Sequence, residues 1–140
     1  MSEELVFRFK VDGEDFTSAG QASVQVKKNL RQLGLSADII KKVSVAMYEG
    51  EINMVIHAGG GEATVRVCEH YVEIVLEDHG PGIKDIDLAM QEGYSTASDT
   101  IRSLGFGAGM GLPNMQKYTD YMTIDSTVGV GTTIVMRVNC

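Results

Sequence analysis

The chain has 140 residues, of which 44% are hydrophobic and none is Trp, and its formal net charge is −7. This length suits one domain, which buries roughly two-thirds of the surface that its unfolded chain exposes. Apolar runs end well short of the about 18 residues of a membrane-spanning helix. The N-terminal sequence MSEELVFRFK is acidic where a secretion signal needs basic residues. We therefore expect one cytoplasmic domain over residues 1–140, with no membrane partner.

The acidic balance also bears on the ligand. Binding to a phosphate backbone needs a basic face, so we expect no direct nucleic-acid partner. A polyphosphate ligand would need a metal ion and backbone N–H groups to supply most of the positive potential. Cys68 and Cys140 do not form a disulfide framework.

The first part of the sequence predicts one strand and then two helices. Residues 4–13 (ELVFRFKVDG) alternate apolar and polar side chains, which is the period of a strand. Thr17 or Ser18 is expected to cap the first helix, which Gly34 ends. Ser36 begins the second helix, which ends at residues 59–61. The inward-facing positions of the two helices are Ala22, Val26, Leu30 and Leu33, and then Ile40, Val43, Met47, Gly50 and Met54.

The rest of the sequence mixes strands and helices without regular alternation. The predicted elements are strands Glu62–Glu69 and Tyr71–Asp78 joined at His70, a short helical stretch Lys84–Gln91, a glycine-rich stretch Gly93–Gly111, a helix Leu112–Thr119 that Pro113 opens as its first helical (N1) residue, and strands Tyr121–Ser126 and Thr132–Val138. This order favours an α+β fold: a two-layer sandwich of a mixed, mostly antiparallel sheet with helices on one face.

The second helix carries polar residues among its apolar ones. Glu49, Asn53 and His57 are four residues apart and form one ridge, whereas Glu51 points about 200° away from Glu49. The simplest interpretation is that all four face water, which we expect for Glu51. Gly50 costs up to about 1 kcal/mol against Ala inside a helix, which suggests close packing there.

Two further motifs favour a nucleotide. Asp78 ends an apolar strand and begins D-x-G-x-G with Gly80 and Gly82, a pattern that lets a flat heterocycle approach the backbone, although these residues also form ordinary turns. An alternating glycine series then enters a helix, whose free N–H groups suit phosphate oxygens; this favours a phosphate loop, with a flexible loop as the alternative. That series is Gly105, Gly107, Gly109 and Gly111, and it fits neither G-x-G-x-x-G nor a P-loop.

A zinc site and a serine nucleophile find little support in the sequence. Thr133 follows Gly131 in a strand of β-branched residues and would join a site only if it pointed toward Asp78. The histidines lack zinc-ligand spacing, and G-x-S-x-G is absent.

The order of these motifs over residues 36–138 resembles the GHKL ATPase superfamily, whose nucleotide site consists of an N box, a G1 box and a G2 box. The short chain and the segment EGYSTAS (Glu92–Ser98) are similar to the bacterial anti-sigma-factor and stressosome-switch serine/threonine protein kinases. The resemblance implies a Bergerat-type ATP-binding fold with ATP and Mg²⁺ as cofactors.

The resemblance also implies roles for individual residues. Glu49 takes the position of the general base, and Asn53 that of the Mg²⁺ ligand. Asp78 would accept from the adenine amino group, with Gly80 and Gly82 beside the base. The remaining roles fall on Thr133, which would help Asp78; on Gly105, Gly107, Gly109 and Gly111, which would wrap the phosphates; and on Arg102, which would face nucleotide or partner.

The function that follows is an ATP-dependent serine/threonine kinase that phosphorylates a small regulatory partner and so regulates transcription. By resemblance the substrate is a STAS-like antagonist protein, a sigma factor or a phosphatase is a second partner, and the kinase forms a homodimer. The main alternative is a non-catalytic ATP/ADP sensor that switches protein partners. A structural domain without a ligand is a third hypothesis.

Overall fold

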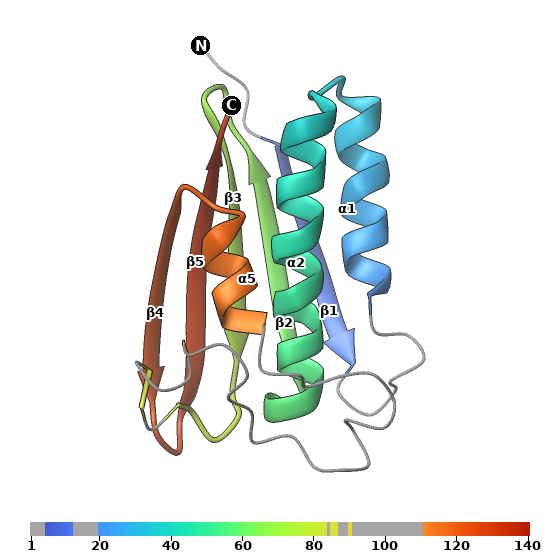
Figure 1. Ribbon diagram of the computed structural model, residues 1–140. Helices are drawn as coiled ribbons and strands as arrows, with labels where there is room; N and C mark the ends of the chain where they lie inside the picture. Colours follow the sequence, from blue (N-terminus) through green and yellow to red (C-terminus); the bar gives the residue numbers. More distant parts are fainter. Residues whose placement is uncertain (1–4, 13–19, 84, 87–89, 91–110) are drawn as a thin grey trace.

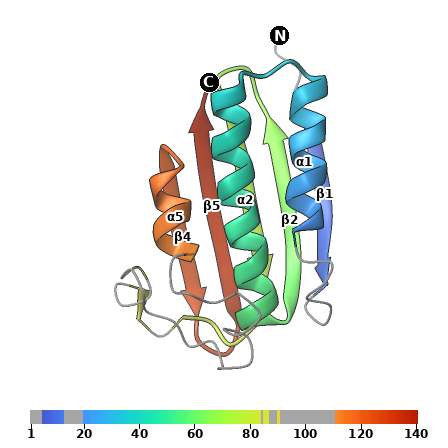
Figure 2. The same cartoon turned by 45° about the vertical axis from the view of Figure 1, so that its right-hand side comes forward.

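The computed structural model describes residues 5–12, 20–83, 85–86, 90 and 111–140. Within them, five strands form one sheet in the order β1-β2-β3-β5-β4, and helices cover one face of it (Figures 1 and 2). The elements are β1 (Leu5–Asp12), α1 (Gln21–Gln32), α2 (Ala37–Ala58), β2 (Gly60–Val67), β3 (Tyr71–Asp78), α5 (Gly111–Lys117), β4 (Tyr121–Thr127) and β5 (Gly131–Asn139). The predicted α+β fold with helices on one face is confirmed.

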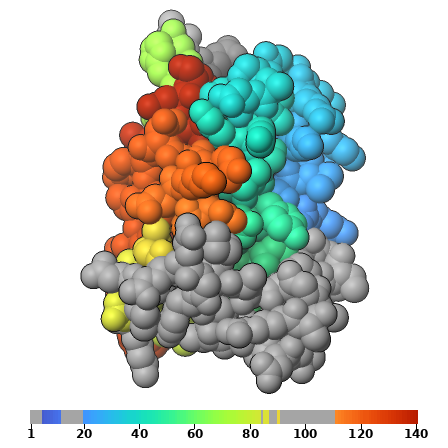
Figure 3. Space-filling view, in the orientation of Figure 1, coloured from blue at the N-terminus to red at the C-terminus, as the bar shows by residue number. Residues whose placement is uncertain are grey.

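The sheet is simpler than the predicted mixed one. All four strand pairings among the described residues are antiparallel. Ile74 lies opposite Val65 on one side and Met136 on the other, and all three are fully buried under the helices. Figure 3 shows the side chains of α1, α2 and α5 closing over this face. No helix in the described ranges is long and apolar enough to cross a membrane.

The central helix α2 follows the predicted pattern. Its inward positions Ile40, Val43, Met47, Gly50 and Met54 are all buried. The Ser36 hydroxyl accepts from the Ile39 N–H at 3.3 Å, as expected of an N-cap. The helix ends at Gly59 in the left-handed region (φ 71°), but Gly60 and Gly61 already belong to β2. The predicted end of the helix was therefore too long by two residues.

Gly50 is required by close packing. A Cβ atom on this residue would collide with Leu76 Cδ1 of β3 and lie 3.4 Å from Met115 Cε of α5. Leu76 and Met115 are themselves buried, so α2 can approach the sheet and α5 this closely only with glycine here.

Helix α1 starts in a different way from the prediction. Its N-cap is Gly20, in the left-handed region (φ 97°) and with no side-chain cap, while Thr17 and Ser18 lie outside the described residues. The acceptor comes from α2 instead: Glu51 Oε2 accepts from the Gly20 N–H at 2.7 Å, and Oε1 accepts from the Ser23 N–H at 3.2 Å.

Glu51 is therefore not solvated, and that prediction was wrong. Its side chain is only 2% exposed, and burial raises its pKa although the backbone N–H groups at the start of α1 lower it. The helical geometry placed Glu51 away from Glu49 correctly, but that second side of α2 faces α1 rather than water.

Several other boundaries differ slightly. Pro113 is the third residue of α5 as described, not its first, and Leu33 is exposed just beyond α1. Of the predicted helical stretch Lys84–Gln91, the structure gives one helix-like bond, from the Met90 N–H to the Ile86 carbonyl at 2.9 Å. Most of that stretch, and the glycine-rich stretch up to residue 110, lies outside the described residues.

Candidate nucleotide site

The candidate site lies where the C-terminal half of α2 meets the end of β3, the beginning of β5 and the start of α5. Helix α5 packs beside α2, and its first residue, Gly111, lies next to Glu49: a Cβ atom there would be 3.8 Å from Glu49 Oε2 (Figure 1). The last glycine of the series predicted to hold phosphate thus lies beside the predicted general base. Gly105, Gly107, Gly109 and Arg102 lie outside the described residues.

Glu49 is half-buried and oriented by a neighbour. The Asn114 amide of α5 donates from Nδ2 to Glu49 Oε1 at 3.3 Å. Asn114 was not among the predicted site residues. Its signal in the sequence was its position in the first turn of the helix after the glycine series, but only the packing of α5 on α2 shows that it meets Glu49.

Asn53 and His57 continue the same side of α2. Asn53 is half-buried, and its amide makes no hydrogen bond within the described part of the chain, so its oxygen is available to a ligand. His57 is half-buried in the last turn, where burial lowers its pKa and favours the neutral imidazole.

Asp78 ends β3 and fixes the turn that follows. Its Oδ1 accepts from the Gly80 N–H at 3.0 Å and from the Thr132 N–H at 3.2 Å, while Oδ2 makes no hydrogen bond in the described ranges. A Cβ atom on Gly80 would be 2.7 Å from Ala58 Cα, so the turn lies directly against the last turn of α2. Asp78 therefore shares one end of the molecule with Asn53.

Thr132, not Thr133, lies beside Asp78. Thr132 is opposite Asp78 in the β3–β5 register, whereas Thr133 is opposite Glu77 on the uncovered face of the sheet. The condition set for Thr133 is not met, because successive residues of a strand point to opposite faces.

A second hydroxyl joins Thr132 near Asp78. The Thr132 Oγ1 and Ser126 Oγ atoms are 2.8 Å apart, and Ser126 Oγ also accepts from the Ile83 N–H at 2.8 Å. Ser126 and Thr132 were both missed by sequence reasoning. Only the β3–β5 register, which the structure supplies, identifies Thr132 as the residue opposite Asp78.

The sequence defines the class of this protein. A family model described as a histidine kinase-like ATPase domain matches residues 14–138, and the chain belongs to that family. This confirms the predicted relationship to the GHKL superfamily. ATP use is a property of that family.

Similar proteins of known name include a serine/threonine kinase and an anti-sigma factor. The serine/threonine-protein kinase RsbT of Bacillus subtilis is 30% identical over 118 residues, which cover 81% of this chain and 83% of that protein. The anti-sigma F factor of Clostridium acetobutylicum is 32% identical over 139 residues, 96% of this chain and 90% of that one.

A solved structure shares the fold. The RsbU and RsbW domains of Rv1364c from Mycobacterium tuberculosis superimpose with a TM-score of 0.64 at 15% identity. The match covers 96% of this chain and 32% of that longer one. At this identity the similarity supports the fold alone, in agreement with the single sheet and its layer of helices.

Proposed function

We propose that this chain is a cytoplasmic, ATP-dependent serine/threonine kinase of the anti-sigma regulatory type, which phosphorylates a small STAS-like regulatory protein. Relatives named as a serine/threonine-protein kinase and as anti-sigma factors support this class of activity. A sigma factor or a phosphatase is the proposed second partner, and transcription is the process regulated.

One observation carries the proposal. Glu49 and Asn53 lie one turn apart on the side of α2 that faces the start of α5, and Asn114 holds the Glu49 carboxylate at 3.3 Å. A protein that only binds nucleotide has no need for a fixed carboxylate at this position. A kinase needs one to accept the proton of the attacking hydroxyl.

The residues present fit the purine end of ATP. Asp78 keeps one oxygen available while backbone N–H groups fix the other, so the carboxylate is oriented before a ligand arrives. Its free oxygen would accept from the adenine amino group. We assign the assisting role to Thr132 in place of Thr133, together with Ser126. Gly80 and Gly82 would border the base without side chains in the way.

The residues also fit a magnesium ion at the phosphate end. The amide oxygen of Asn53 is a ligand that Mg²⁺ accepts, and such sites commonly use one or two protein ligands and fill the rest with waters and phosphate oxygens. The ion would supply positive charge to the phosphates, in a chain whose net charge is −7. Gly111, with Gly105, Gly107 and Gly109 before it, would approach the phosphates, and Glu49 would receive the proton.

The test separates binding from transfer. Titration with Mg²⁺ and ATP is expected to show binding that Asp78→Asn and Asn53→Ala each weaken. Incubation with γ-labelled ATP and purified STAS-domain proteins of the same genome is then expected to label a Ser or Thr, and Glu49→Gln to remove the label while ATP still binds. Glu69→Gln, an exposed carboxylate in the β2–β3 turn, is the matched control. Binding without any transfer would instead support a nucleotide sensor.

A further inference from the structure

A groove lies on the other side of α2, between the edge of the sheet and the beginning of α1. Its volume is about 750 Å³, and the residues that matter for its chemistry are Arg8, Phe9, Lys10, Val24 and Tyr48. Figure 2 shows β1 at the edge of the sheet with α1 beside it. The nucleotide site uses none of these residues.

Strand β1 leaves one edge open. It is the end strand of the sheet and pairs only with β2 among the described strands. Alternate N–H and C=O groups of an end strand point outward and can pair with an added strand, which is how many extended peptides bind.

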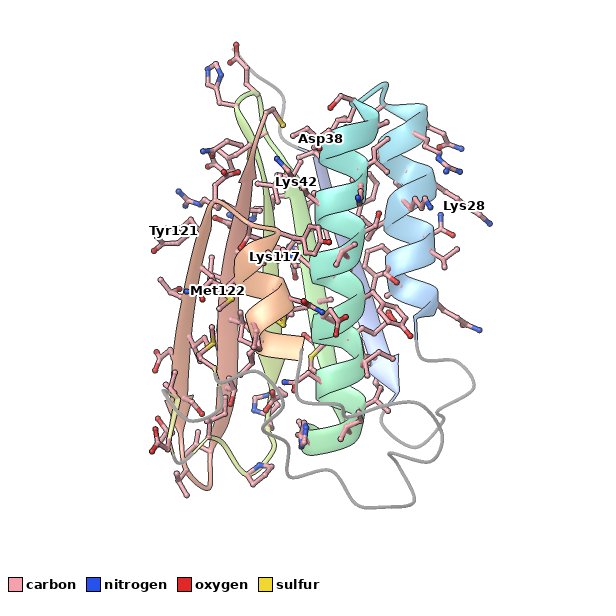
Figure 4. The ribbon with its side chains drawn as sticks, viewed as in Figure 1. Lys28, Asp38, Lys42, Lys117, Tyr121 and Met122 are labelled. Carbon is pink, nitrogen blue, oxygen red and sulfur yellow. The ribbon has the colours of Figure 1, made fainter. Side chains whose placement is uncertain are left out.

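The groove is both basic and apolar. Arg8 and Lys10 are exposed on β1, while Val24 is 55% and Tyr48 41% exposed. Further cations follow on α1, which has no acidic residue: Lys27, Lys28 and Arg31. Lys28 projects from the outer side of α1, whereas Lys42 on α2 is paired with Asp38 at 3.1 Å (Figure 4). Glu62 is opposite Lys10 in the β1–β2 register, whereas Arg8 is opposite Thr64, so the cations outnumber the acidic residues at this edge of a chain whose net charge is −7.

We propose that this groove binds an extended segment of a partner protein in which acidic residues alternate with apolar ones, added as a strand to β1. Successive residues of a strand point to opposite faces. Acidic side chains on one face would therefore meet Arg8 and Lys10, while apolar ones on the other would meet Phe9, Val24 and Tyr48.

The charges disfavour the symmetric pairing of two β1 strands centred on Phe9. Two copies of β1 paired antiparallel about Phe9 would place Arg8 of one opposite Lys10 of the other, and like charges directly opposite each other are destabilising. An anionic membrane is flat, whereas this surface is hollowed between two elements.

The groove is lined in part by α2, the helix that carries Glu49. Tyr48 is its neighbour in sequence. Gly20, which also lines the groove, lies against the Tyr48 ring, and its N–H donates to Glu51 at 2.7 Å. A segment bound here would therefore be held against α2 itself. The inference does not depend on phosphoryl transfer, because it concerns binding in the absence of nucleotide.

Amide chemical-shift mapping of the full chain tests the proposal. A short synthetic peptide in which Glu alternates with Val is expected to shift residues 5–12, residues 20–25 and Tyr48. A peptide of the same composition with its Glu and Val residues in two blocks is expected to bind more weakly, as is the alternating peptide with N-methylated amides.

Variants of the groove sharpen the test. Arg8→Glu/Lys10→Glu is expected to lower the affinity about tenfold or more, and Arg8→Gln/Lys10→Gln less so while keeping the side-chain length. Lys117→Glu on α5, across α2 from α1, is the matched control and should leave binding unchanged (Figure 4).

Three results would overturn the proposal. One is the absence of shifts at these residues with the alternating peptide. Another is their appearance only with phosphatidylglycerol vesicles, which would assign the surface to a membrane. The third is concentration-dependent shifts at the same residues without peptide, which would assign the groove to a second copy of the chain.

Discussion

The two sides of helix α2 use the same residue type for opposite purposes. On the side facing α5, Glu49 is half-buried, receives one hydrogen bond from Asn114, and lies beside an amide that is available to a ligand. On the side facing α1, Glu51 is 2% exposed and both its oxygens accept backbone N–H groups. The two carboxylates are two residues apart on one helix.

The difference shows that environment assigns the role. A carboxylate whose acceptor sites are filled by backbone donors fixes structure, because it has little capacity left for a substrate. A carboxylate held at one oxygen by a side-chain amide is oriented but can still take a proton. Burial and partners thus distinguish Glu49 from Glu51 where sequence spacing shows only that they point in different directions.

Exchanging each carboxylate for its amide is the strongest test of this contrast. Glu49→Gln is expected to lower the rate of phosphotransfer about 10²- to 10⁴-fold, the range for loss of a general base, with little change in thermal stability. Glu51→Gln is expected to leave the rate within a few-fold of the wild type and to change stability instead. Single-turnover transfer and thermal unfolding of both variants measure the two effects. If Glu51→Gln lost as much activity as Glu49→Gln, the proposed division of roles would be wrong.

Removing the Glu51 carboxylate should cost the most stability. In Glu51→Ala the N–H groups of Gly20 and Ser23 lose their acceptor inside the protein, and we expect a loss of about 2–4 kcal/mol in the free energy of unfolding. Urea denaturation gives this value. Glu69→Ala, at an exposed position, serves as the control and should change stability by less than about 0.5 kcal/mol. A loss of that small size for Glu51→Ala would mean that α1 does not depend on this carboxylate.

The same contrast shows how far sequence reasoning reached. Spacing along one chain predicted the inward stripe of α2 and the shared face of Glu49 and Asn53, because helical periodicity is local. It could not show which element covers the other side of α2. The interpretation of Glu51 as solvated failed for that reason: the donors at Gly20 and Ser23 are about 30 residues earlier in the chain.

Register limited the predictions in the sheet. Thr133 was predicted to help Asp78, but Thr132 is the residue opposite Asp78, and a difference of one residue in a strand reverses the face. The pairing of β3 with β5 joins segments more than 50 residues apart, and the sequence alone does not fix it. Asn114 and Ser126 were missed for the same reason, since each enters the site only through contacts between distant elements.

Gly50 lies between the two sides of the helix and tests how tightly α2 must pack. Gly50→Ala places a methyl group against Leu76 Cδ1 in a buried contact, and we expect a net loss of about 1–3 kcal/mol despite the better helix propensity of Ala. Denaturant unfolding measures the loss. The double variant Gly50→Ala/Leu76→Val should recover part of it, because it removes bulk at the point of collision. Two independent, additive losses would show that Leu76 is not the obstacle.

The smallest expected effect is the pH dependence of stability. Burial raises the pKa of Glu51 above its usual 4.5, so over a range above that pH the folded chain keeps a proton that the unfolded chain has released. The free energy of unfolding should therefore fall as pH rises through this range and level off above the folded pKa. His57 acts in the opposite direction: burial lowers its pKa below 6.5, so its contribution to stability is lost as pH falls.

Subtracting the pH profile of the unfolding free energy of Glu51→Gln from that of the wild type isolates the contribution of Glu51, because both proteins contain His57. The difference, wild type minus variant, should be largest below pH 4.5 and decline as pH rises above it. Urea unfolding across this range provides the measurement. A difference that stayed flat would show that Glu51 ionises in the folded protein as readily as in the unfolded chain. The backbone N–H groups of α1 would then compensate fully for its burial, and the α1 side of α2 would hold its carboxylate with no net electrostatic penalty.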